Sequence, residues 1–100
     1  MAVETLVALQ VDDAESYRRY REGMMPLLKA LGGRFGYDFE IAKVLKSETE
    51  EPINRVFTLR FPDRATMESF FANEEYLKIR NEFFEPAVSA VTMIALYERD

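Results

Sequence analysis

The side chains best suited to chemistry lie in a predicted β-hairpin that spans residues 34–61. Both arms of the hairpin alternate between apolar and other residues, which is typical of strands with one buried face. On this alternation Asp38 and Glu40 of the first arm face the same side of the sheet as Arg60 of the second. Two carboxylates beside a guanidinium group could move a proton or hold an anionic substrate. Arg34, at the start of the hairpin, is a second cation that could reach the same ligand.

Two interpretations of this group stay open. In the first, a cross-strand ion pair only fixes the register of the hairpin and contributes ~0.2–1 kcal/mol. In the second, a partner subunit closes a cavity over the group, and burial raises the pKa of at least one carboxylate so that it can act as a base. We take Arg34, Asp38, Glu40 and Arg60 as candidate ligand-binding residues and assign no catalytic residue.

The composition excludes several classes of site. The chain contains no Cys and no His, which excludes disulfides, thiolate nucleophiles, Ser-His-Asp triads and most zinc sites. It also lacks a glycine-rich phosphate loop, so we expect neither a metal nor a cofactor. A net charge of −5 without a basic stripe argues against nucleic acid. There is no signal peptide and no apolar run of the ~18–20 residues that cross a bilayer, so we expect a cytoplasmic protein without membrane contact.

Periodicity and capping residues outline the elements that position these side chains. Because a proline inside a helix removes a hydrogen bond, we expect a bend or break near Gly23–Met25, next to Pro26. A fresh N-cap at Asn73 predicts an interruption of the second helix at Ala72–Asn73. The predicted elements are a strand at 3–11, a helix from Asp12 or Asp13 to Gly32-Gly33, hairpin arms at 34–45 and 53–61, a helix from Asp63 to Pro86, and a strand at 89–98.

The element order β-α-β-β-α-β predicts an α+β fold of the ferredoxin-like type, formed by residues 1–100 as a single domain. Both helices of that fold cover one face of the sheet. The other face should then carry polar groups together with an apolar set that is too large to stay in water. We therefore expect a homodimer that packs sheet against sheet and leaves a small polar cavity inside. The expected apolar set is Leu6, Ala8, Val56, Ile94 and Leu96.

Short motifs along nearly the whole chain resemble one family. They are Asp12, Tyr17 and Tyr20; Pro26 before a Leu-rich turn; Gly32-Gly33-Arg34-Phe35; Arg55; Phe61-Pro62; and Glu75-Tyr76. With them the chain resembles the domain of unknown function 1330 family, within the dimeric α/β-barrel superfamily. It departs from that pattern at Tyr37-Asp38-Phe39-Glu40, where relatives often carry an Arg-Gly-Gly type of segment, and at Asn73-Glu74, where many have Ser. The resemblance implies a ferredoxin-like protomer, a face-to-face sheet dimer and pockets used for varied chemistry, without an agreed reaction.

Three classes of function remain. The first is a homodimer with a small-molecule-binding cavity between the sheet and its partner. The second is a cofactor-independent enzyme that performs proton transfer, isomerisation or oxygenation on a small acidic or aromatic metabolite. The third is a protein-interaction module. A raised carboxylate pKa at Asp38 or Glu40 would favour the enzyme, and an apolar surface left open outside the dimer would favour the interaction module.

Overall fold

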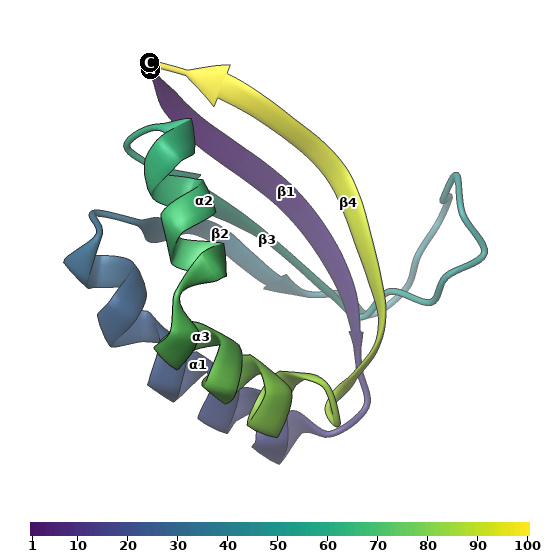
Figure 1. Cartoon of the computed structure of the whole chain (residues 1–100). Coiled ribbons are helices and arrows are strands. Elements are labelled where there is room, and N and C mark those ends of the chain that lie inside the picture. The colour runs from purple at the N-terminus through teal and green to yellow at the C-terminus, as the bar shows by residue number, and fades with distance from the viewer.

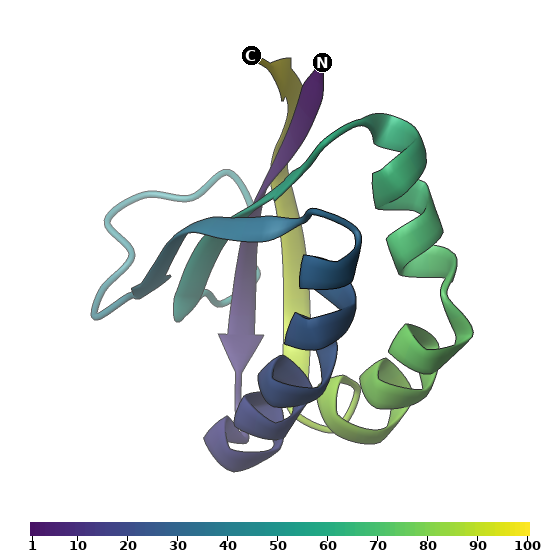
Figure 2. The ribbon, with the colours of Figure 1, turned by 90° about the vertical axis from the view of Figure 1, so that its left-hand side faces the viewer.

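A computed structural model describes residues 1–100 and shows a four-stranded antiparallel sheet with helices on one face only (Figures 1 and 2). This arrangement confirms the predicted ferredoxin-like α+β fold. None of the helices is both long and apolar enough to cross a membrane. The elements are β1 (Ala2–Val11), α1 (Ala14–Ala30), β2 (Arg34–Glu40), β3 (Arg55–Phe61), α2 (Arg64–Ala72), α3 (Glu74–Ile79), a π-helical turn η1 (Arg80–Phe84) and β4 (Val88–Arg99).

The sheet has the strand order β2-β3-β1-β4, so the two ends of the chain form adjacent strands. The central strand β1 pairs antiparallel with β3 on one side and with β4 on the other. Its alternate residues Val3, Val7 and Leu9 face the helices and are buried. They belong to one core of 15 buried residues between the sheet and the helices. Glu4, Leu6 and Ala8 face the side that no helix covers, called here the uncovered face (Figure 2).

Polar side chains begin each helix where the sequence predicts a cap. Asp13 accepts a hydrogen bond from the amide of Ser16 at 3.1 Å, and Asp63 accepts one from Thr66 at 2.7 Å. Asn73 separates α2 from α3 and accepts a hydrogen bond from the amide of Tyr76 at 3.0 Å. Such side chains satisfy amides that have no partner inside the helix. The predicted interruption at Ala72–Asn73 is therefore confirmed.

Helix α1 runs from Ala14 to Ala30 without the break that Pro26 predicted. A proline deprives the carbonyl four residues earlier of its hydrogen bond, and here that carbonyl belongs to Glu22. Both Glu22 and Pro26 are exposed, so water can satisfy the carbonyl and the helix can continue. The buried residues of α1 are Tyr17, Tyr20, Met24 and Leu28, which recur at the three- and four-residue intervals of an amphipathic helix.

A β-bulge in the first arm of the hairpin changes which side chains face the helices. Phe35 is opposite Leu59 and Asp38 is opposite Phe57, so three steps along β2 match two steps along β3. The amide of Tyr37 leaves the ladder and donates to Thr58 Oγ1 at 2.8 Å. An extra residue reverses the alternation beyond it. The strand is also shorter than predicted and ends at Glu40.

A second bulge lies in β4, where Leu6 pairs with Ala95 but Val7 pairs with Met93. Ile94 is the extra residue, and beyond it Leu96 pairs with Thr5 on the helix-covered side. The prediction that Leu96 belongs to the uncovered face is therefore wrong. Residues 41–54 join β2 to β3 as a long loop that projects from the uncovered side of the sheet (Figure 2).

Candidate functional site

The four predicted site residues divide between the two faces of the sheet. Arg34 and Arg60 are cross-strand neighbours on the uncovered face. Asp38 and Glu40 lie beyond the bulge, opposite Phe57 and Arg55, and therefore face the helices. The prediction that Asp38, Glu40 and Arg60 share one face and one cavity is wrong, because the bulge shifts the alternation by one residue. A ligand-binding role for these four residues stays a prediction.

Asp38 is held between two arginines instead. Arg21 of α1 donates to both of its carboxylate oxygens at 2.9 and 3.1 Å, and Arg55 donates to both at 3.1 Å. Arg21 also stacks over the ring of Phe35, with its guanidinium carbon 3.9 Å from the centroid. The group links α1 to the β2–β3 hairpin with bidentate charge-assisted hydrogen bonds. Its geometry is that of a structural clamp.

The electrostatics of Asp38 agree with this geometry. Burial acts to raise the pKa of its carboxyl, but hydrogen bonds from Arg55 and Arg21 outweigh burial and hold the pKa below its ordinary value. The hypothesis of a raised pKa is thus wrong for Asp38, which stays ionised and paired at neutral pH. A carboxylate in that state is a weak general base.

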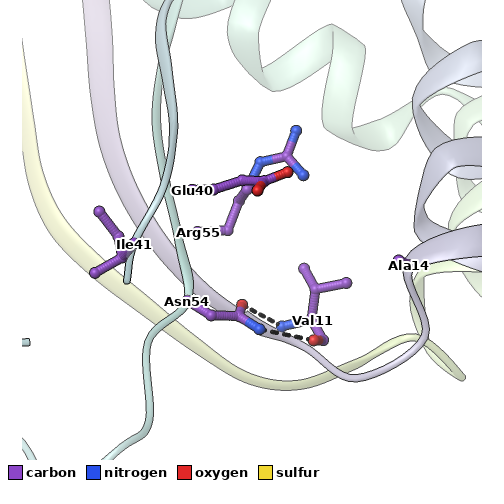
Figure 3. A pocket seen from close by; sticks show the side chains of 6 residues that line it. All are labelled: Val11, Ala14, Glu40, Ile41, Asn54 and Arg55. Atoms are coloured by element: carbon purple, nitrogen blue, oxygen red, sulfur yellow. Dashed lines mark hydrogen bonds between the residues drawn. The ribbon is translucent and has the colours of Figure 1, made fainter. Parts of the chain in front are cut away.

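Glu40 lines a depression at the end of the hairpin, next to the start of α1 (Figure 3). Its carboxylate lies beside the guanidinium of Arg55, whereas Ile41 points to the opposite side (Figure 3). The base of this depression is fixed by Asn54, whose side chain both accepts from and donates to the main chain of Val11 at 2.8 Å. These paired hydrogen bonds anchor the end of the 41–54 loop to β1.

A different cavity, of about 300 Å³, lies on the helix-covered side of the sheet. Ten of its eleven lining residues are hydrophobic. The lining comes from the sheet, from α1 and from the segment α2–η1. Its deep wall is buried, whereas Phe71, Val91 and Met93 are exposed at its rim. The complete lining is Val7, Leu9, Tyr20, Phe57, Leu59, Phe71, Tyr76, Arg80, Phe84, Val91 and Met93.

Two of the residues that line this helix-side cavity are buried tyrosines, Tyr20 and Tyr76. Tyr20 Oη of α1 and Tyr76 Oη of α3 lie 2.9 Å apart and form a hydrogen bond. Burial, above all, raises the pKa of both phenols, so both keep their protons at neutral pH. One proton satisfies the hydrogen bond between them, and the second hydroxyl proton can be donated elsewhere.

Arg80 is the only charged residue that lines the helix-side cavity. It opens the π-helical turn η1, donates to Glu85 at 2.6 Å and has its guanidinium carbon 5.0 Å from the centre of the Phe84 ring. Single π-helical turns within helices occur frequently at functional sites. Sequence reasoning assigned Tyr20 and Tyr76 to the core or to family motifs, and it missed Arg80. The only signal was that both tyrosines lie on apolar helix stripes although each carries a hydroxyl.

The strand order and the one-sided helix layer place the chain in the class of ferredoxin-like α+β proteins. Residues 5–95 match the family described as "Domain of unknown function (DUF1330)". Since the match covers most of the chain, the protein belongs to this family. No curated protein matches the sequence.

Solved structures share the fold at low sequence identity. A protein of unknown function from Rhodopseudomonas palustris has a TM-score of 0.84 at 18% identity, with 98% of this chain and 82% of that chain covered. A dabb family protein with a ferredoxin-like fold from Mesorhizobium loti has a TM-score of 0.68 at 14% identity, with 98% of this chain and 96% of that chain covered. A dimeric ferredoxin-like protein of unknown function from Jannaschia sp. CCS1 has a TM-score of 0.62 at 14% identity, with 99% of this chain and 100% of that chain covered.

Proposed function

We propose that the protein is a homodimer in which each protomer binds a small, largely apolar molecule with one anionic group in the helix-side cavity. The observation that carries this proposal is the lining of that cavity, which is apolar apart from two phenolic hydroxyls and one guanidinium group. Ligand sites in proteins are typically apolar hollows of ~300–1,000 Å³ with a few convergent polar groups. At about 300 Å³ the cavity suits a molecule of one or two rings.

The polar groups specify the chemistry of the ligand. The unshared hydroxyl proton of the Tyr20–Tyr76 pair favours a ligand with a hydrogen-bond acceptor at that end. Arg80 favours a carboxylate or similar anion, because a guanidinium group presents paired donors to a planar anion. Glu85 holds the guanidinium in place at 2.6 Å and is exposed, so it can remain in water when a ligand binds.

The uncovered face supports the homodimer. Leu6 and Val56, both partly exposed, form an apolar strip across β1 and β3, and Tyr37 and Phe39 extend it over β2 with exposed fractions of 62% and 51%. Exposed aromatic side chains beside an apolar strip are typical of protein interfaces. The Jannaschia protein of the same fold is described as dimeric. A second copy packed on this face would complete a dimeric α/β barrel.

The two alternative functions have less support. An enzyme with Asp38 as its base conflicts with the lowered pKa of that carboxyl. The tyrosines of the helix-side cavity keep their protons, so they are better placed to donate hydrogen bonds than to abstract a proton. A protein-interaction module would use the uncovered face, which the proposed homodimer occupies.

Binding of 2-naphthoate and of its uncharged amide, followed by NMR with the native protein, tests the proposal. We expect the acid to shift signals of Tyr20 and Tyr76 and to bind roughly tenfold more tightly than the amide. Arg80→Gln should remove the preference for the acid, whereas the control Lys78→Gln, on the exposed side of α3, should retain it. Equal binding of acid and amide by the wild type, or shifts confined to the surface, would contradict the proposal. Native mass spectrometry of the purified protein would then search for the natural ligand.

A further inference from the structure

A row of charged side chains crosses the uncovered face near the chain termini and has no role in the proposed function. Arg34 of β2 is directly opposite Arg60 of β3, and Arg60 is directly opposite Glu4 of β1. Glu4 in turn is opposite Tyr97 of β4. Like charges directly opposite each other destabilise a sheet. The Arg34–Arg60 pair therefore needs a reason beyond the fold.

Glu4 neutralises only part of this row. Glu4 as a residue is 4% exposed, although no helix covers it, and its carboxylate accepts hydrogen bonds from Tyr97 and from Arg99 at 3.0 and 3.2 Å. The hydrogen bond from Tyr97, aided by Arg99, holds the pKa of Glu4 below its ordinary value although burial opposes this. Glu4 is thus ionised, and three guanidinium groups face one carboxylate. The guanidinium groups therefore outnumber the side-chain carboxylate of the row, in a chain whose net charge is −5.

The three arginines differ in how fully their donors are used. Arg99 is bound to Glu4, and Arg60 donates to the main-chain oxygen of Asp100 at 2.8 Å, which shows that an oxygen acceptor fits beside it. Arg34 is exposed and makes no hydrogen bond or ion pair within the chain. Each guanidinium group has five N–H donors, so most donors of Arg34 and Arg60 remain free.

The shape of the surface leaves room for a small anion at this point. A depression of about 320 Å³ is lined by seven residues: Glu4, Arg34, Phe35, Gly36, Tyr37, Arg60 and Arg99. Gly36 is required at this edge of the depression, because a Cβ at this position would lie 2.6 Å from Thr58 Oγ1 and 3.6 Å from Glu4 Oε1.

We propose that Arg34 and Arg60, with Arg99 held in place by Glu4, form a binding site for a small dianion of the phosphate or dicarboxylate type. Two guanidinium groups facing each other across paired strands can each offer a fork of donors to one oxyanion. The bound dianion would offset the excess of positive charge and reduce the repulsion between Arg34 and Arg60. This site lies on the opposite face of the sheet from the helix-side cavity, so it stands independently of the ligand proposed there.

Calorimetric titration of the native protein with inorganic phosphate and, separately, with malonate at low salt tests this site. We expect saturable binding of at least one dianion, and the stronger of the two identifies the ligand class. Arg34→Gln should weaken it at least tenfold, whereas Arg64→Gln, an equal change of net charge at the exposed start of α2, should leave it within twofold. Glu4→Gln, which removes the opposing charge, should tighten it.

Because Arg34 is exposed and its side chain is unpaired within the chain, Arg34→Gln should fold. Its phosphate and malonate affinities therefore test the site even if Glu4→Gln fails to fold. Binding of neither dianion, or equal weakening by Arg34→Gln and Arg64→Gln, would overturn the proposal. A wild-type affinity that rises only when the homodimer is dissociated would show that the partner subunit occupies this surface, and it would overturn the proposal as well.

Discussion

At the scale of single residues, Asp38 shows how one carboxylate can look catalytic in a sequence and be structural in the fold. The sequence places it among charged residues on an alternating strand, which is equally consistent with a base and with an ion pair. The structure gives it four hydrogen bonds from Arg21 and Arg55. Because Arg21 has only 14% of its side chain exposed, loss of the carboxylate would leave a partly buried cation without its partner.

Replacement of Asp38 by Asn should therefore destabilise the protein by about 1–2 kcal/mol at neutral pH. The folded pKa of Asp38 lies below its ordinary value of 3.8, so its stabilising effect is complete above that pH and is lost as the pH falls through the folded pKa. We expect the difference between wild type and Asp38→Asn to shrink below about pH 4. Urea unfolding across this range measures the difference.

The exposed Glu68→Gln variant is the control for removal of a negative charge, and it should change stability by less than ~0.5 kcal/mol. A more stable Asp38→Asn protein at neutral pH would contradict the clamp. That result would restore the reading in which burial raises the pKa of this carboxyl.

At the scale of elements, periodicity and caps predicted the strands and helices, whereas the faces of two strands were wrong. Alternation assigns a face correctly only while the ladder is regular. Each bulge inserts one residue, and the pattern beyond it still alternates. The alternation therefore gives no sign that Asp38 and Leu96 have changed faces. The bulge in β2 depends on Thr58, a partner about twenty residues away, which no local pattern could reveal.

Two buried threonines test how far this bulge depends on its side-chain hydrogen bond. Thr58 is 6% exposed and accepts the amide of Tyr37, whereas Thr5 is 2% exposed and its hydroxyl has no partner. Thr58→Val should cost about 1–2 kcal/mol because it leaves that amide unsatisfied. Thr5→Val keeps the shape and removes an unpaired polar group, so it should be neutral or stabilise by ~1 kcal/mol.

Chemical denaturation of both variants measures this difference, and amide hydrogen exchange at Tyr37 reports the bulge directly. Exchange at Tyr37 should become faster in Thr58→Val and stay unchanged in Thr5→Val. If both variants lost the same stability, the hydroxyl of Thr58 would have no special role, and the bulge would be set by packing alone.

At the scale of the whole molecule, the helices protect one face of the sheet and leave the other to a partner or to solvent (Figure 2). The sequence predicted this asymmetry from the order of the elements. It could not show that the cavity with the best ligand chemistry lies on the helix side, because that cavity is formed by residues far apart in the chain, from Val7 to Met93. In the proposed function, assembly therefore uses one face and apolar ligand binding the other.

The last prediction tests the proposed homodimer on the uncovered face. Phe39 is half exposed, lies opposite Val56 and has its ring centre 5.8 Å from that of Tyr37, so a charge there would disturb the interface more than the protomer. Phe39→Lys should weaken dimerisation roughly a hundredfold, because its ammonium group would be buried without a partner. The control Leu77→Lys places the same charge on an exposed apolar residue of α3 and should leave the dimer intact. Light scattering at micromolar concentration measures both, and a monomeric wild type, or a dimer unaffected by Phe39→Lys, would rule out assembly through this face.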